Sequence, residues 1–212
     1  MTSKRCRSTD VRLGHLVYKP WVAAVSLIRD ADILLFDEQA GSFESAEIGL
    51  LSMSTTSHVE LAKWWGSMLC SVGMVDLGGR AIALEKHLRD GRTVHVYRVR
   101  ANARQRALAS KAILQGLLHN YSRGAIRRQI WLRQPVLRRL TRWLWPGEIQ
   151  TARDDDANGG WHDMMCAEFV AKVWEAGEKD ITPHMAPFAM QPINFAESAI
   201  CRYQFTLRYP EG

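Results

Sequence analysis

The sequence predicts an α+β fold in which an antiparallel sheet packs against helices. Short apolar runs, several of them alternating with polar residues and ending at glycines, are typical of antiparallel strands joined by tight turns. Two longer stretches, at 101–119 and between Asp163 and Gly177, instead carry apolar residues at helical spacing. The 212 residues, 47% of them hydrophobic and eight of them tryptophan, suffice to bury one core. We therefore expect a single domain over residues 1–212.

Most of the predicted strands lie in the first hundred residues. The first, Ile33 to Phe36, is wholly apolar between two aspartates, as expected of a buried strand. Gly66 falls between the second and third strands and can take the positive φ of a tight hairpin. The pair Gly78-Gly79 is expected to end the third strand. The predicted strands are 33–36, 58–63, 68–75, 80–84 and 93–99, with a closing strand at 202–208.

Helices are predicted between and after these strands. Asp163 is expected to cap the start of a helix with a continuous apolar stripe, and Gly177 to end that helix. Residues 9–30 are expected to form a short helix or an extended arm. The other predicted helices span 42–53, 101–119 and 193–198.

Cys166 and His58 supply the two halves of a thiol-hydrolase site. Cys166 falls in the first turn of its predicted helix, where unpaired N–H groups and the helix dipole favour a thiolate and can bind an oxyanion. His58 alone of the seven histidines begins a strongly apolar strand, which would hold a general base rigidly. Taken separately, a strand histidine is more often structural and a cysteine at a helix start is more often inert.

The order of five short motifs resembles the circularly permuted branch of the NlpC-type papain-like cysteine peptidases. The YiiX-like proteins belong to that branch, which is related to the lecithin:retinol acyltransferase-like proteins. The resemblance covers about residues 30–100 and 160–208, and it implies a papain-like, circularly permuted fold with the nucleophile at a helix N-terminus. The motifs are Asp32-Ile33-Leu34-Leu35-Phe36, Ser57-His58-Val59, Gly78-Gly79-Arg80, Cys166-Ala167-Glu168-Phe169-Val170, and Pro183 followed by Ile193-Asn194-Phe195-Ala196-Glu197-Ser198.

The resemblance also implies a chemistry. Cys166 would attack an amide or ester carbonyl to give an acyl-enzyme, and His58 would activate the thiol and then protonate the leaving group. The implied substrate is an amide bond in a peptidoglycan peptide, cleaved by an endopeptidase or amidase. No cofactor and no metal ion are expected, because the four cysteines show neither CxxC spacing nor a neighbouring histidine pair.

The third catalytic residue departs from the family pattern. Relatives usually carry a glutamate on the strand after the histidine, and our alignment places Gly73 at that position. Glu60, where relatives have glycine or alanine, points to the same face of its strand as His58 and lies across from residues 72–73. We expect Glu60 to fill the space left by Gly73 and to orient His58. Asp76 is the competing candidate, and a site of only Cys166 and His58 is the third alternative.

The net charge of +6 comes largely from one basic, tryptophan-rich insertion at about residues 120–160. The segment could be a lid, an arm that binds an acidic polymer or an amphipathic element on a membrane surface, but packing of its apolar residues on the sheet is favoured. Nucleic acid is not expected as a partner, because no recognition module accompanies the charge. The arginines assigned to an anionic surface are Arg127, Arg128, Arg138, Arg139 and Arg142.

Residues 1–30 are expected to form an N-terminal arm without the apolar core of a signal peptide, and no apolar run of about 18 residues predicts a membrane-spanning helix. Synthesis in the cytoplasm is expected, with delivery to a target periplasm by a specialised secretion or phage-tail-like machine. The protein would then be an antibacterial effector with a cognate inhibitor protein. The alternatives are a lipid-directed thioesterase or acyltransferase, and a catalytically inactive binding protein on the same scaffold.

Overall fold

A computed structural model gives the fold of the chain. It describes residues 18–37, 56–75, 78–118, 164–183, 185, 187 and 190–208.

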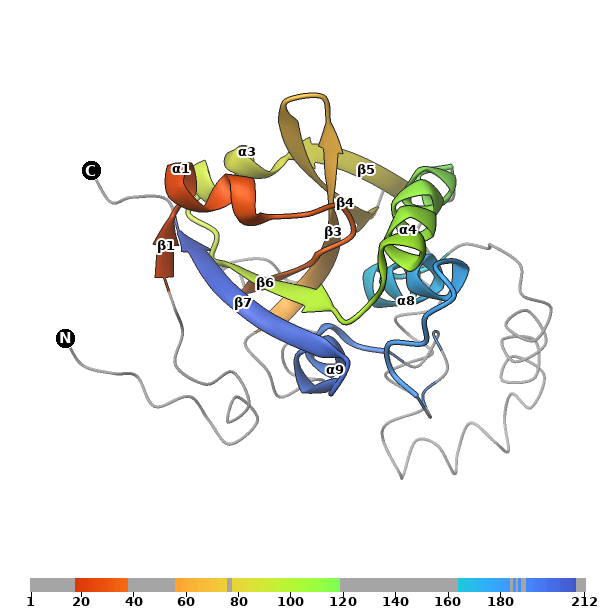
Figure 1. Cartoon of the computed structure of the whole chain (residues 1–212). Helices are drawn as coiled ribbons and strands as arrows, with labels where there is room; N and C mark the ends of the chain where they lie inside the picture. The colour runs from red at the N-terminus through yellow and green to blue at the C-terminus, as the bar shows by residue number, and fades with distance from the viewer. Residues whose placement is uncertain are drawn as a thin grey trace, which may run out of the picture.

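Within these residues, seven strands form one curved sheet in the order β1-β7-β6-β2-β3-β4-β5 (Figure 1). Neighbouring strands are antiparallel, except that β1 at one edge runs parallel to β7. The fold is α+β with a mainly antiparallel sheet, as predicted. The strands are β1 Tyr18–Pro20, β2 Ile33–Asp37, β3 Thr56–Trp65, β4 Met68–Val75, β5 Gly78–Ala83, β6 Val94–Val99 and β7 Cys201–Arg208.

The predicted hairpin joins β3 to β4. Gly66 has a φ of 59°, and Trp65 pairs with Met68 across the turn. The first strand of the hairpin is longer than predicted because Trp64 continues the ladder. Its backbone N–H donates to Asp30 Oδ1 at 2.8 Å, and its indole N–H donates to the carbonyl of Ile28 at 3.0 Å.

The expected role of Gly78-Gly79 as the end of β4 is wrong, because both glycines lie in β5 and pair with the last residues of β4. A Cβ on Gly79 would lie 2.7 Å from the Cα of Leu117. The glycine therefore lets the C-terminal end of the helix that Leu117 caps approach β5 closely. The local sequence around Gly79 does not predict this contact.

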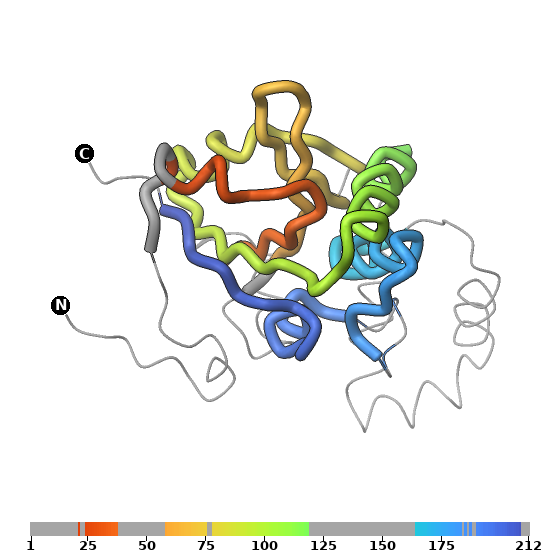
Figure 2. The backbone as a smooth tube through the Cα atoms, viewed as in Figure 1, coloured from red at the N-terminus to blue at the C-terminus, as the bar shows by residue number. Residues whose placement is uncertain are grey.

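The helices cover both sides of the sheet. Figure 2 shows α4 and α8 side by side against one side, with α9 below them near β7. The short α3 packs on β4 and β5, and α1 lies beside β1 and β7. Their bounds are α1 Trp21–Ala24 with the 3-10 turn η2 Val25–Leu27, α3 Leu84–Arg89, α4 Ala103–Gly116, α8 Cys166–Ala176 and α9 Pro192–Glu197.

The ends of the two longest helices show why they form where they do. Asn102 caps α4 by accepting from the backbone N–H of Gln105 at 2.8 Å, and Gln105 returns a bond to the Asn102 backbone. The N-cap position of α8 is Met165, so the expectation that Asp163 caps this helix is wrong; Asp163 itself lies outside the described residues. Gly177 ends α8 as predicted.

The side chains of the sheet divide into two cores, one on each face, because they alternate along every strand. Along β2, Ile33 and Leu35 join a core with α4 and α8, whereas Leu34 and Phe36 join a core with α3. From Cys166 to Trp174 every residue of α8 is buried, so this helix lies at the centre of the molecule.

Several sequence predictions concern segments outside the described residues. These are the helix at 42–53, residues 1–17 of the arm and the basic insertion at 120–160, with its five named arginines. Among the described helices, none is long and apolar enough to cross a membrane.

Candidate active site

His58 and Glu60 are held side by side on β3. They lie two residues apart, so both side chains project from the same face of the strand. His58 Nε2 and Glu60 Oε1 are 2.9 Å apart. The Glu60 side chain is 1% exposed and that of His58 is 18% exposed, so the carboxylate is buried while the ring remains accessible.

Gly73 on β4 makes room for the Glu60 side chain. Leu61 pairs with Val72, so the register places Gly73 opposite Glu60. A Cβ on Gly73 would lie 2.5 Å from Cγ of Glu60, which is closer than real side chains approach. The expected contact between Glu60 and His58 is therefore present, in the space that Gly73 leaves. The competing candidate, Asp76, lies outside the described residues.

Cys166 is the first residue of α8, and its thiol is in hydrogen-bonding contact with the His58 ring. The Glu60 carboxylate lies 2.9 Å from Nε2 of that ring, which leaves Nδ1 as the ring nitrogen available to exchange a proton with the thiol. The first intrahelical bond runs from the N–H of Phe169 to the carbonyl of Met165. The N–H groups that precede it have no partner within the helix and belong to the same first turn as Cys166.

The charges of neighbouring side chains set the protonation states of His58 and Glu60. Burial lowers the pKa of His58, but the negative charges of a Cys166 thiolate and of Glu60 outweigh it and raise that pKa well above 6.5. Burial raises the pKa of Glu60, but the hydrogen bond and the positive charge of His58 hold it well below 4.5. The arrangement favours a protonated His58 ring beside an ionised Glu60 carboxylate.

Two further side chains contact the Glu60 carboxylate from behind. Arg80 Nη2 on β5 lies 3.5 Å from Oε1, and His87 Nε2 on α3 lies 3.6 Å from Oε2. Burial, with the positive charges of Arg92 and Arg80, lowers the pKa of His87 to about 4, although Glu60 opposes this shift. His87 is therefore neutral at physiological pH, and Arg80 carries the second positive charge beside Glu60.

Neither Arg80 nor His87 is among the site residues predicted from the sequence. Arg80 was part of the Gly78-Gly79-Arg80 motif, which offered a signal. His87 lies in a short helix between two strands, and no local pattern relates it to β3. Phe36 on β2 links the two histidines, because its ring centroid is 5.9 Å from that of His58 and 5.0 Å from that of His87.

The other cysteines in the described part of the chain have different surroundings. Burial raises the pKa of Cys70, and it raises that of Cys201 to about 12. Cys166 differs from both, because a histidine ring with a carboxylate behind it contacts its sulfur. The described residues contain no group of three or more His, Cys, Asp or Glu side chains arranged to hold a metal ion.

Comparisons with known proteins give a likeness in structure and none in sequence. No family model matches the sequence, and no curated protein matches it. Among solved structures, the chain is similar to the crystal structure of the metalloprotein YiiX from Escherichia coli O157:H7, with a TM-score of 0.49 and 14% sequence identity. The match covers 86% of this chain and 89% of that one. Function is therefore inferred from the residues themselves.

Proposed function

We propose that the protein is a cysteine hydrolase that cleaves an amide bond through a thioacyl-enzyme. The observation that carries this proposal is the position of one imidazole, His58, between the thiol of Cys166 and the buried carboxylate of Glu60. A nucleophile, a base within reach of it and a group that orients the base are the parts that covalent acyl transfer requires.

In the acylation step, His58 already holds the proton that the thiol has given up, and the thiolate attacks the substrate carbonyl carbon. The carbonyl oxygen becomes an oxyanion beside the N–H groups of the first turn of α8, where the helix dipole stabilises negative charge. The intermediate then collapses, the carbon–nitrogen bond breaks, and the imidazolium donates its proton to the departing amine. The products of this step are a free amine and a thioester on Cys166.

In the second step, His58 takes a proton from water and the hydroxide attacks the thioester. The carbon–sulfur bond breaks, the carboxylic acid leaves, and the imidazolium returns its proton to the sulfur or keeps it opposite the thiolate. Throughout both steps Glu60 stays ionised and fixes the ring, and Arg80 offsets part of its buried charge.

The order of the site along the chain supports a papain-like, circularly permuted fold. The strand with His58 precedes the helix with Cys166, the sheet is antiparallel, and the nucleophile is the first residue of a buried helix. These are the features that the family resemblance implies. The same resemblance is our basis for proposing a peptide of peptidoglycan as substrate.

Two other functions use the same scaffold. A lipid-directed thioesterase or acyltransferase would employ the same cysteine on an ester, and a binding protein would leave it inert. Because Glu60 supplies the carboxylate missing at residue 73, the departure from the family pattern that motivated an inert protein is compensated by a residue of this chain.

The proposal is tested by the rate of Cys166 alkylation with iodoacetamide across pH, read by mass spectrometry of the modified peptide. In the wild type we expect reaction well below pH 8.5, the ordinary pKa of a thiol, and in His58→Ala we expect that reaction to be lost. Buried Cys70 in the same protein is an internal control for unfolding. Ordinary thiol behaviour in both proteins would contradict a catalytic pair.

We also propose that the protein acts in a target periplasm and is held inactive in its own cell by a cognate inhibitor. Expression with an added periplasmic signal should lyse cells in the wild type but not in Cys166→Ala. Release of new amines from purified peptidoglycan identifies the bond, and release of fatty acid from phospholipid vesicles instead would favour the lipid-directed enzyme. Harmless periplasmic expression of active wild type would contradict the effector role.

A further inference from the structure

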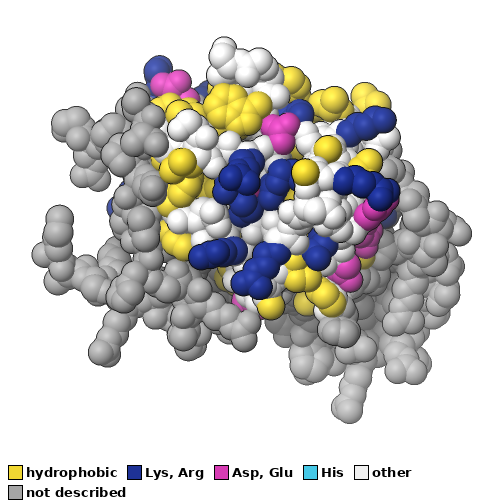
Figure 3. Space-filling model, in the orientation of Figure 1, with side chains coloured by type: hydrophobic (Ala, Val, Ile, Leu, Met, Phe, Trp, Pro, Cys, Tyr) yellow, Lys and Arg dark blue, Asp and Glu magenta, His cyan; other side chains and the backbone are white. Residues whose placement is uncertain are grey.

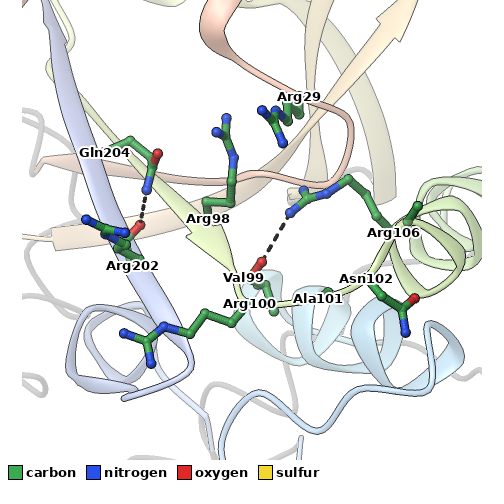
Figure 4. Close-up of a pocket in the computed structure, with 10 residues that line it drawn as sticks. Arg29, Arg98, Val99, Arg100, Ala101, Asn102, Arg106, Arg202 and Gln204 are labelled. Carbon is green, nitrogen blue, oxygen red and sulfur yellow. Dashed lines mark hydrogen bonds between the residues drawn. The ribbon is translucent and has the colours of Figure 1, made fainter.

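A second concave site lies away from Cys166, and arginines line it. The cavity has a volume of about 520 Å³, within the range of small-molecule sites. Its side chains come from the loop before β2, from β6 and the loop after it, from α4 and from β7 (Figure 4). Five of them are arginines: Arg29, Arg98, Arg100, Arg106 and Arg202. We call this cavity the arginine pocket.

The arginine pocket and the thiol site lie at opposite ends of the strands. On β2, Phe36 pairs with His58, whereas Ile33, at the other end of the strand, pairs with Tyr97, the residue before Arg98. Similarly, Cys166 begins α8, and the far end of that helix contacts the start of α4 through the bond from Gln105 to the carbonyl of Glu178. A ligand in the arginine pocket would therefore not contact the sulfur.

Two arginines of the arginine pocket are held in place by a buried carboxylate. Asp32 is fully buried and accepts from Arg98 Nη2 at 2.6 Å and from Arg106 Nη1 at 3.1 Å. Arg106 also donates to the carbonyl of Val99 and lies over the ring of Trp174, with 5.7 Å from its guanidinium carbon to the ring centroid. Both guanidinium groups are thus fixed before any ligand arrives, which lowers the entropy cost of binding.

The other three arginines of the arginine pocket are exposed, and their side chains have no hydrogen bond or ion pair among the described residues. They are Arg29, Arg100 and Arg202. Figure 3 shows Lys and Arg side chains gathered across the middle of this face, with few acidic ones among them. Burial, and to a smaller extent the positive charges of Arg98 and Arg29, lower the pKa of Arg106, against the opposing effect of Asp32.

The start of α4 adds to the positive potential of the arginine pocket. Asn102 and Ala103, the cap and first residue of the helix, both line the cavity. The partial positive charge of a helix N-terminus favours anions, and guanidinium groups bind oxyanions through paired N–H donors. A multiply charged oxyanion would relieve the mutual repulsion of the arginines as it binds.

We propose that the arginine pocket binds a phosphate-bearing ligand with at least two negative charges, either a small molecule or the headgroup of a lipid. The site is independent of the proposed hydrolase chemistry, since it neither contains nor contacts Cys166 or His58. The ligand chemistry follows from five guanidinium groups, a helix N-terminus and a cavity of small-molecule size at one place.

The test uses full-length protein and two probes. Isothermal titration with sodium tripolyphosphate measures binding of a small phosphate, and co-sedimentation with vesicles of cardiolipin and phosphatidylcholine measures binding of a headgroup, because the cardiolipin headgroup carries two phosphates. The pocket variant is Arg100→Gln with Arg202→Gln, both at exposed positions. The control is Arg89→Gln, an exposed arginine on α3 that removes one charge outside the arginine pocket.

We expect one of the probes to bind the wild type, with an affinity that falls as salt rises. The pocket variant should lose about tenfold or more in affinity, because it loses two charge-assisted donors, while the control should stay within about twofold. Tripolyphosphate binding assigns a small ligand, and vesicle binding alone assigns a headgroup. The proposal is overturned if neither probe binds, if the pocket variant binds unchanged, or if the control loses as much. Cys166→Ala should bind like the wild type, so the result does not depend on the hydrolase.

Discussion

Gly73 and Glu60 face each other across β3 and β4 so closely that the carboxylate side chain occupies the place where another residue would have its Cβ. The distance from that Cβ position to Glu60 Cγ is 2.5 Å. The carboxylate reaches the histidine from β3 itself, whereas the family resemblance places it on the following strand. The two positions are thus one unit: a glycine at 73 is what permits a glutamate at 60.

A side chain at residue 73 should therefore disable the site. In Gly73→Ala the methyl group would displace Glu60 from His58, so we expect at least a tenfold fall in the rate of Cys166 alkylation at pH 6.5. Overpacking should also cost about 1–3 kcal/mol of unfolding free energy in urea. An alanine variant with unchanged reactivity and unchanged stability would show that the contact is dispensable.

Exchanging the residues at positions 60 and 73 should restore part of the Cys166 reactivity that each single substitution removes. Gly73→Glu adds a second buried carboxylate beside the first, and Glu60→Gly removes the carboxylate that contacts His58, so both variants should be inactive. The double variant places a single carboxylate on β4, the arrangement that the family resemblance implies, and should recover part of the alkylation rate. If all three variants were equally inactive, a carboxylate at residue 73 could not replace the one at residue 60.

Removing the charge of Glu60 while keeping its size tests its role as a positioning residue. In Glu60→Gln the pKa of His58 should fall, because one of the two negative charges that raise it is gone. The pH at which Cys166 becomes reactive should then rise, with at least a tenfold loss of rate near neutrality. Glu85→Gln, at an exposed position on α3, is the control. Full reactivity of Glu60→Gln would favour a site of only two residues.

His87 should make the fold sensitive to mild acid. Its pKa in the folded protein is about 4, below the 6.5 of the unfolded chain. Between pH 4 and pH 6.5 the unfolded state therefore binds more protons than the folded state. Stability is therefore present above pH 6.5 and is lost as pH falls through this window. From pH 6.5 to 5 we expect a loss on the order of 1–2 kcal/mol.

The measurement is urea unfolding at both pH values in the wild type and in His87→Gln. The variant should lose less stability between the two pH values than the wild type does. Glu60 stays ionised in this range, because its pKa lies well below 4.5, and therefore does not contribute to the difference. An identical pH dependence in the two proteins would contradict the assignment to His87.

Asp32 should be among the most costly residues to change. It is fully buried and contacts two guanidinium groups, and Asp32→Asn leaves both charges without their carboxylate. Breaking a buried ion pair in this way costs roughly 3–5 kcal/mol. In Glu178→Gln, which removes the exposed pair with Arg104, the loss should stay below about 1 kcal/mol. Urea unfolding of the two variants at neutral pH makes the comparison.

Much of the fold could be predicted because its elements are encoded locally. The alternation along β6 and the apolar run of β2 depend only on neighbouring residues, and the structure has both strands within a residue of the predicted bounds. The cap of α8 could not be predicted, because Asp163 is a good capping residue in isolation, yet the helix begins later, at Cys166. The role of Gly79 depended on the approach of α4, far along the chain.

The sequence by itself determined which residues could carry chemistry: a cysteine at a helix start, a histidine on a buried strand, and a glutamate two residues from it on the same face. Side-chain period and helix spacing suffice for these statements. Only the tertiary structure decided that α8 brings its sulfur to His58, and that Arg80 and His87 close around Glu60. It also decided that five arginines from five segments meet in one cavity. Such contacts depend on strand register and helix packing. Because distant parts of the chain contribute to both, a local sequence pattern cannot predict them.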